Sequence, residues 1–472
     1  LRHLGRDNTA LLAESLAIDP LQMGCLYEES RRTGTPEVWR TVMRQEAHNY
    51  LDLALHYAKA GLLEEAVEIL QACPEQSPMP SYYEGYLHGL AGDEAAARAC
   101  CLRAEHLPAP RCYPNRVEEI AIREYAVRLL GRAPRAHALL GCLLYDKKQA
   151  DAAIAHWEAS VQQDPGQALV HRNLAIARYN KQGDADAALR EMEQARRLDP
   201  GYPRLLLEYD QLAARLGRSN AARLQLLEEN LALVEQRDDL MLRYVTLLNC
   251  EGRCEEALQI LLTRRFHPWE GGEGKVSAQY RYALIRLAKD CLNRGENDRA
   301  VQLLEQSKTY PDTLGEGKLP NVPDNEADYW QGVALRAMGR EPEAAAAFLR
   351  AASGPQEPGR VLYYNDQPSD FIYYQGLAQR AMGNEAAARK AFHKLLTYGE
   401  THLFDAVAYD FFAVSLPEIE VFADDIALRN RQYCNYLRAL GCAGLGRTSE
   451  AAELFAGILE LQPDDQGALR HA

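Results

Sequence analysis

The segment RRFHPWEGGEGKV (residues 264–276) gathers the residues of this chain whose types could do chemistry. Glu270 and Glu273 form a pair of carboxylates, the arrangement used for acid/base cleavage of sugars. Trp269 offers a ring on which a sugar could stack, and His267 could act as a ligand. Each residue also has a structural reading. The carboxylates can be solvated or accept backbone hydrogen bonds, His267 can pack within the loop, and Trp269 can anchor the loop between repeats. We favour these structural readings.

The same segment is glycine-rich and contains Lys275, as a phosphate-binding loop would. It lacks the GxxxxGK[ST] spacing, a Ser or Thr after the lysine, and a preceding strand. The rest of the sequence contains no HExxH, GxSxG or strand-linked GxGxxG pattern. The sequence therefore predicts no catalytic residue, no metal site and no cofactor, and we expect this chain not to be an enzyme.

The eleven cysteines include no CxxC pair. The nearest neighbours in sequence lie within helical patterns, which is typical of small residues buried at helix contacts. No second Cys or His pair accompanies them, so a zinc site is not expected. This usage indicates a reducing compartment, and we expect a cytoplasmic location.

Composition describes the scaffold that must position these residues. Ala, Leu, Glu and Arg dominate and β-branched residues are sparse, so helix is the expected structure. The net charge of −14 argues against nucleic acid as a partner and against an electrostatic membrane anchor. No run of eighteen apolar residues occurs. Because the chain starts at Leu1 and residues 1–20 read as the end of a repeat, we expect a fragment of a longer protein.

A repeated unit organises the whole chain. Its first mark is a glycine that closes an amphipathic run: Gly61, Gly92, Gly183, Gly217, Gly252, Gly295, Gly339, Gly383 and Gly446. An alanine follows each glycine: Ala66, Ala97, Ala188, Ala222, Ala257, Ala300, Ala344, Ala388 and Ala451. Four residues later comes a larger side chain: Leu70, Cys101, Met192, Leu226, Leu261, Leu304, Phe348, Phe392 and Phe455. A tenth unit has Lys148, Ala153 and Trp157 at these places.

Each mark has a mechanical reason. The glycine suits the residue after a helix, where the backbone turns left-handed. The alanine lets two helices approach closely, and the larger residue fills the space between neighbouring pairs. Regular units are 34 to 35 residues long, as from Gly183 to Gly217 and from Pro165 to Pro200. We therefore expect an all-α solenoid of about ten helix-turn-helix repeats.

This pattern resembles the tetratricopeptide (TPR) repeat, which implies a right-handed superhelix. Four further strings resemble the TPR half of large bacterial proteins that carry an N-terminal, uncharacterised β-sandwich of galactose-mutarotase type. These strings are RRFHPWEGGEGKV, PDTLGEGKLPNVPDNE, YYNDQPSDFIYYQG and FFAVSLPEIEVF. The resemblance implies that a sugar-related domain precedes Leu1.

The TPR resemblance also implies an inner groove lined by the first helix of each pair. The residues placed there are mostly tyrosines, which combine an apolar face with a hydroxyl group. Ordinary packing between repeats is the alternative for all of them. The candidates are Tyr145, Tyr179, Tyr282, Lys289, Tyr329, Arg336, Tyr373, Arg380 and Tyr436.

Regularity divides the chain into three segments: residues 1–133 with an extra helix, the regular array 134–262, and 263–472 with long loops between repeats. The loops are 264–276, 310–325 and 353–369, and a helical insertion is expected near 402–427. Long ordered loops are often functional. We expect these three to stack along one edge of the array and to contact one another.

Two functions remain open. In the first, the array binds a protein segment or its own upstream β-sandwich domain without catalysis. In the second, the loops help to complete a carbohydrate-binding or carbohydrate-processing site with an upstream domain, and an oligosaccharide is the partner.

Overall fold

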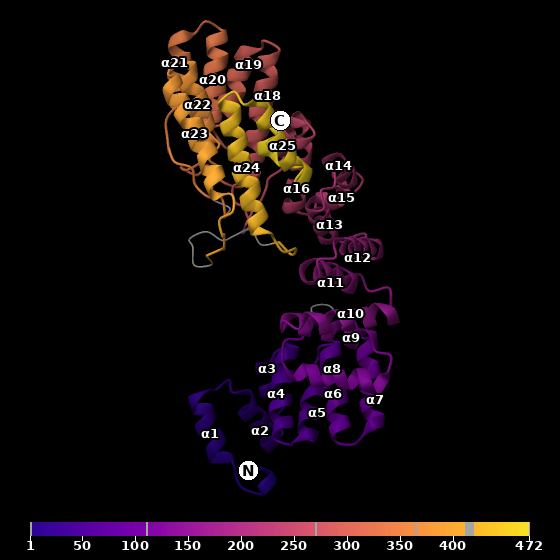
Figure 1. Cartoon of the computed structure of the whole chain (residues 1–472). Helices are drawn as coiled ribbons and strands as arrows, with labels where there is room; N and C mark the ends of the chain where they lie inside the picture. The colour runs from indigo at the N-terminus through magenta and orange to yellow at the C-terminus, as the bar shows by residue number, and fades with distance from the viewer. Residues whose placement is uncertain (1, 110–111, 270, 364–365, 411–419, 472) are drawn as a thin grey trace. The chain divides into compact units, whose positions relative to one another are not determined.

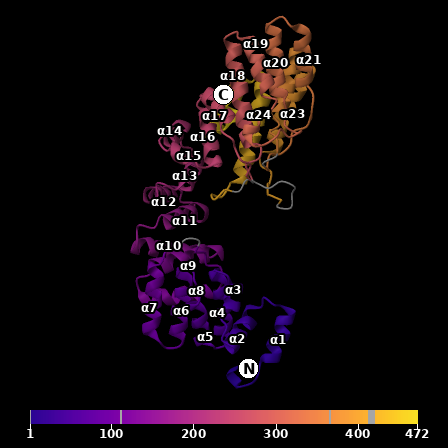
Figure 2. The same cartoon turned by 180° about the vertical axis from the view of Figure 1, so that it is seen from behind.

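The computed structural model describes residues 2–109, 112–269, 271–363, 366–410 and 420–471. All regular secondary structure in these residues is helical, so the fold is all-α (Figures 1 and 2). The chain forms two compact units, Leu1–Ala177 and Arg178–Ala472. The three segments expected from sequence reflect the regularity of the repeats, whereas these two units reflect which helices contact one another.

The first unit consists of antiparallel helix pairs preceded by a short 3-10 turn. Its apolar core extends from Leu26 to Leu139 and continues around Trp157. The extra helix expected within residues 1–133 corresponds to α8. The helices are η1 (Arg2–Leu4), α1 (Thr9–Ile18), α2 (Met23–Thr33), α3 (Glu37–Met43), α4 (Ala47–Lys59), α5 (Leu63–Gln71), α6 (Pro78–Leu90), α7 (Glu94–His106), α8 (Glu118–Leu130), α9 (Pro134–Asp146), α10 (Ala150–Gln163) and α11 (Ala168–Ala177).

The second unit continues the same arrangement of pairs. It begins with a π-helical turn, η2 (Arg178–Gln182). The helices that follow are α12 (Ala185–Leu198), α13 (Pro203–Arg215), α14 (Asn220–Glu228), α15 (Leu231–Val234), α16 (Asp238–Cys250), α17 (Cys254–Thr263), α18 (Lys275–Asn293), α19 (Asn297–Gln306), η3 (Asp312–Leu314), α20 (Asn325–Ala337), α21 (Glu341–Ala351), α22 (Phe371–Ala381), α23 (Glu385–His402), α24 (Ile426–Gly444), α25 (Thr448–Leu461) and α26 (Gln466–Leu469).

The turn within each pair has the backbone that the repeated glycine predicts. All nine glycines have positive φ, between 64° at Gly217 and 87° at Gly383. In the tenth unit Lys148 also has a positive φ of 64°, although it carries a side chain. The repeat geometry therefore imposes a left-handed residue even where glycine is missing.

In nine of the ten units, the repeated alanine and the larger residue four positions later are both buried. Eight of the nine repeated alanines, and Ala153, are buried, and the larger residues four positions later are buried with them. The exception follows Gly217. There the second helix begins one residue later, after the cap Ser219, so each side chain rotates to the next position. Ala222 is exposed and Leu226 only partly buried, while Arg223 and Leu227 take the inward places.

The segment near 402–427 differs from the expected helical insertion. Helix α23 extends to His402 and α24 begins at Ile426, and residues 403–410 and 420–425 between them contain no helix. The remaining residues, 411–419, lie outside the described part of the chain. Residues 420–425 instead follow an irregular path beside α13. Backbone groups of Val421 and Ala423 form hydrogen bonds with the side chain of Asn180, which belongs to η2.

The three long loops contact their neighbours in sequence order. The amide of Phe266 donates to the carbonyl of Thr313 at 2.8 Å, which joins the first loop to the second. Glu316 in the second loop accepts from the amides of Gly274 and Ser277. At the end of the second loop, Asn325 donates to the carbonyl of Ser353, where the third loop begins.

Candidate protein-binding groove

An inner groove in the second unit is lined by α16, α18, α20, α22 and α24, the first helices of successive pairs. Residues 464–471, which we call the groove segment, lie in it. The side-chain amides of Gln279 on α18 and Gln466 exchange hydrogen bonds of 3.0 and 2.7 Å. The ammonium of Lys289 donates to the carbonyl of Arg470 at 3.4 Å. The chain therefore passes from the end of α25 into the groove, which its own residues 464–471 occupy.

Arg470 occupies a site built for a guanidinium group. Its Nη1 lies 2.5 Å from Glu326 Oε2 and 3.9 Å from Asp370 Oδ2, and its guanidinium stacks over the ring of Tyr282 at 5.2 Å. Tyr374 donates its hydroxyl to Glu326 at 2.7 Å. The four groups around Arg470 come from three different repeats, so the stacking of the repeats creates the site.

The pKa values of the two carboxylates of this site shift in opposite directions. Burial by itself would raise the pKa of Glu326, but the charge of Arg470 and the hydroxyl of Tyr374 lower it below its usual value. Asp370 is farther from the guanidinium, and burial raises its pKa. The charge of Arg470 therefore keeps Glu326 ionised, and a buried anion without such a partner is unfavourable.

His471 lies among aromatic rings at the end of the groove segment. Its ring stacks on Phe455 at 5.9 Å and meets the edge of Tyr373 at 5.4 Å. Tyr374 and Tyr436 lie 6.0 and 6.3 Å away. Burial lowers the pKa of His471 to about 3, so the ring is neutral at physiological pH.

The structure brings together some of the predicted groove residues and separates others. Tyr282, Lys289, Tyr373 and Tyr436 all contact the groove segment. Tyr329 lies behind them, against Tyr374 at 6.1 Å.

Arg336 and Arg380 do not reach the groove segment in any contact among the described residues. Their guanidinium groups stack on Phe348 and Phe392, at 4.5 and 4.9 Å. These rings approach the first helix closely, because a Cβ atom at Gly332 would lie 2.6 Å from Phe348. Both arginines therefore cover the packing of their own repeats.

Tyr145 belongs to the first unit, where its ring packs on Trp157 at 5.4 Å. This contact is the packing alternative considered for the tyrosines. Tyr145 therefore belongs to a different compact unit from the tyrosines that contact the groove segment.

The loop residues 264–276 have structural partners. Asp238 accepts hydrogen bonds from the backbone amide and the ring Nδ1 of His267, both at 2.9 Å. The ring of Trp269 covers Gly272, where an added Cβ would lie 2.1 Å from it, and packs on the apolar core. Glu273 is half-buried. Glu270 lies outside the described residues, so the proposed carboxylate pair has no described geometry.

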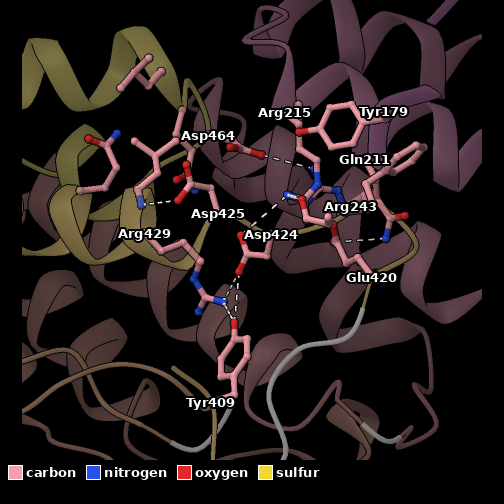
Figure 3. Close-up of a pocket in the computed structure, with 17 residues that line it drawn as sticks. Tyr179, Gln211, Arg215, Arg243, Tyr409, Glu420, Asp424, Asp425, Arg429 and Asp464 are labelled. Atoms are coloured by element: carbon pink, nitrogen blue, oxygen red, sulfur yellow. Dashed lines mark hydrogen bonds and ion pairs between the residues drawn. The ribbon is translucent and has the colours of Figure 1, made fainter. Parts of the chain in front are cut away.

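A cavity of about 650 Å³ adjoins the groove segment at Asp464 (Figure 3). It lies between α13 and α16 on one side and residues 420–432 and the end of α25 on the other. Its walls combine aromatic and apolar groups with charged side chains. The residues are Tyr179, Gln211, Ala214, Arg215, Arg243, Tyr409, Glu420, Phe422, Ala423, Asp424, Asp425, Leu428, Arg429, Gln432, Leu461, Gln462 and Asp464.

Ion pairs hold the irregular segment 420–425 against the cavity. Arg215 donates to Glu420 at 2.7 Å and to the carbonyl of Ala423 at 3.2 Å. On the other side, Asp424 accepts from Arg429 at 2.7 Å. Figure 3 shows these groups pointing toward one another across the opening. Tyr179, the one cavity residue predicted from sequence, meets Phe422 edge to face at 5.4 Å.

A buried network lies behind the part of the cavity wall that Arg243 and Asp464 form. Asp210 accepts from Arg223 at 2.8 and 3.1 Å and from Arg243 at 2.7 Å. Arg223 also donates to Asp464 at 2.9 Å. Burial would raise the pKa of Asp210, but the charges of Arg243 and Arg223 lower it below its usual value. The network joins α13, α14 and α16 to the start of the groove segment.

Sequence reasoning missed most of these cavity residues because they belong to repeats far apart in the chain. Asp464 and Arg223 are 241 residues apart. The signal available was the irregular position of Arg223 in the repeat, together with the long interval between Gly383 and Gly446.

The described residues contain neither a metal-binding cluster nor a membrane-spanning helix. Among them, no cluster of three or more His, Cys, Asp or Glu side chains could hold a metal ion. No described helix combines the length and the hydropathy needed to span a membrane. All eleven cysteines are free thiols.

Comparison with known proteins finds helical repeats. A family model described as a tetratricopeptide repeat matches residues 370–398, which include α22 and most of α23. The solved structure of MamA from Desulfovibrio magneticus is 19% identical and covers 42% of this chain and 99% of its own, with a TM-score of 0.25. YrrB, described as a TPR protein with an unusual peptide-binding site, is 14% identical and covers 48% of this chain and 96% of its own, with a TM-score of 0.30. A tetratricopeptide repeat protein from Parabacteroides merdae is 16% identical and covers 65% and 100%, with a TM-score of 0.27.

Proposed function

We propose that residues 178–472 form a non-catalytic interaction module that binds a segment of a partner protein in the cavity. The observation that carries this proposal is the cavity itself. At about 650 Å³ it falls within the usual range for ligand sites, and it opens beside a groove that holds a peptide segment of this chain.

The cavity walls suit a polypeptide. Peptide backbone needs donors and acceptors, and the walls offer guanidinium, amide and carboxylate groups. The rings of Tyr179 and Phe422 offer a place for an apolar side chain. The groove segment begins at Asp464 in the wall of the cavity, so a bound segment would lie end to end with it.

The loop residues proposed for a sugar site do not line this cavity. Among the described residues, His267, Trp269 and Glu273 are absent from its walls. No contact described here favours the carbohydrate alternative, so it enters only as an outcome of the test.

The test is a selection of random peptides on the purified full chain, followed by isothermal titration of the enriched sequences. We expect Tyr179→Ala to weaken their binding at least tenfold, because it removes a cavity wall, and to change the melting temperature little. Tyr113→Ala is the matched control, since Tyr113 is 68% exposed in the first unit and is absent from the cavity.

Two results would contradict the proposal. One is peptide binding that Tyr179→Ala leaves unchanged. The other is a chain that binds oligosaccharides from a parallel panel but enriches no peptide, which would favour the carbohydrate alternative.

A further inference from the structure

The inner groove presents a second recognition site, separate from the cavity. The structure points to a site for arginine, and we propose that it takes an arginine-containing segment of a partner protein. The groove segment is then an intramolecular competitor that occupies the site until the partner displaces it. This proposal does not depend on the cavity binding anything.

The chemistry of the site selects a guanidinium group. Glu326 is buried and Asp370 is partly buried, and Tyr374 and Tyr436 direct their hydroxyls at these two carboxylates rather than at the ligand, at 2.7 and 3.1 Å. Tyr282 offers its ring face to the cation. A planar guanidinium group can pair with carboxylates and stack on a ring at once, which a lysine ammonium does less well.

Two contacts to this part of the chain do not depend on its sequence. Asn220 donates to the carbonyl of Pro463 at 2.6 Å, just before the groove segment, and Lys289 donates to the carbonyl of Arg470 at 3.4 Å. Carbonyl groups are common to all peptides, so these two side chains hold a backbone of any sequence. The groove also contacts the side chains of Asp464, Gln466 and His471, and Arg470 is the residue that its carboxylates bind.

The segment is also attached in a way that allows release. Its helix, α26, is only four residues long, and the residues before it form the turn at Pro463 and Asp464. A tethered ligand competes at an effective concentration on the order of millimolar. A partner that lacks further contacts therefore binds the intact chain weakly, even if the free groove binds it well.

The binding test uses a labelled, end-capped peptide, QPDDQGALRH, which copies residues 462–471. Fluorescence anisotropy measures its binding to the full chain and to Arg470→Ala. We expect Arg470→Ala to bind the peptide at least tenfold more tightly than the original chain does, because its own segment no longer fills the site. A peptide with alanine in place of the arginine should bind Arg470→Ala at least tenfold more weakly.

Arg253→Ala is the matched control, because Arg253 also pairs with two carboxylates, those of Glu228 and Glu256, but lies outside the groove. Tyr179→Ala should leave peptide exchange unchanged, which separates this proposal from that for the cavity. A folded Arg470→Ala chain that binds neither peptide would overturn the proposal.

A second measurement applies if Arg470→Ala does not fold. Hydrogen exchange of the original chain follows the amides of Leu469, Arg470 and His471, which donate to backbone carbonyls within the segment. An exchangeable competitor opens on its own, so these amides should exchange at least tenfold faster than those in the middle of α25. Exchange at the same rate as α25 would make the segment a fixed part of the core and overturn the proposal.

Discussion

Arg223 is a charged residue at a position where the repeat favours an apolar one. It is 2% exposed, its partner Asp210 is also buried, and its second partner, Asp464, is partly buried. Such a pair adds little stability relative to apolar residues of the same size, but leaving one member alone is strongly unfavourable. The residue therefore makes the second unit depend on a contact between repeats that are far apart in sequence.

Removing this guanidinium should destabilise the second unit. We expect Arg223→Ala to lower the free energy of unfolding by about 3–5 kcal/mol, because Asp210 and Asp464 then share Arg243 as their one remaining cationic partner in this network. Urea unfolding followed by circular dichroism measures the change. Arg253→Ala, which removes an exposed pair, should change stability by about 0–1 kcal/mol. Similar effects of both substitutions would contradict the structural role of Arg223.

His471 should make stability fall with acid. Its pKa is about 3 in the folded chain against a reference of 6.5, so the unfolded chain binds the extra proton between these values. The free energy of unfolding should therefore decrease as pH falls from about 7 to 5, and His471→Asn should reduce this decrease. The raised pKa of Asp370 makes stability rise as pH falls, which is the opposite effect. Because both chains contain Asp370, its effect cancels when their pH dependences are compared. The other groups that face the ring are Glu326, Arg470, Lys289, Tyr373, Tyr374, Tyr436 and Phe455.

Thermal unfolding at several pH values measures this effect. Equal pH slopes for the original chain and His471→Asn would show that the imidazole is accessible to protons in the folded state.

At the scale of elements, the sequence predicted the helix pairs and their turns well. A helix that ends in a tight turn needs a residue with a left-handed backbone directly after it, and glycine suits this position best. The repeated glycines therefore predict where the first helix of each pair ends. The unit after Gly217 departs from the pattern because one extra residue before its second helix rotates every side chain. A single inserted residue changes the inward face of a helix, and the repeated pattern alone does not reveal it.

The predicted groove was harder to obtain from sequence than the pairs. Tyr282 and Lys289 lie on α18 and Tyr373 lies on α22, both first helices of their pairs, because these positions follow from the repeat. The occupant of the groove could not be predicted, since it depends on how far the array curves over many repeats. Small rotations between neighbouring pairs set that curvature, and no local pattern encodes it.

Overpacking one pair tests the element scale. Ala388 on α23 is fully buried, so Ala388→Trp should lower stability by about 1–3 kcal/mol or more as α22 and α23 are forced apart. Glu343→Gln, at an exposed position on α21, should have almost no effect. Urea unfolding compares the two variants. An unchanged midpoint for Ala388→Trp would mean that the helices are not in close contact.

For the whole molecule, the two compact units should be separable. Each has its own apolar core, the condition for independent folding. We expect residues 1–177 produced alone to be helical and to unfold cooperatively. Far-ultraviolet circular dichroism during heating measures this, and a fragment without a cooperative transition would contradict independent folding.

The pairing of Arg223 with Asp464 also has a consequence for biosynthesis. The two residues are 241 positions apart, so a ribosome must add α15 to α25 before the network can close. At about 5–20 residues per second, this takes on the order of 10–50 s. Glu326 and Asp370 are synthesised during this interval and have no groove segment beside them until Arg470 follows. The repeats of the second unit that emerge before then expose these two carboxylates to water and to other proteins.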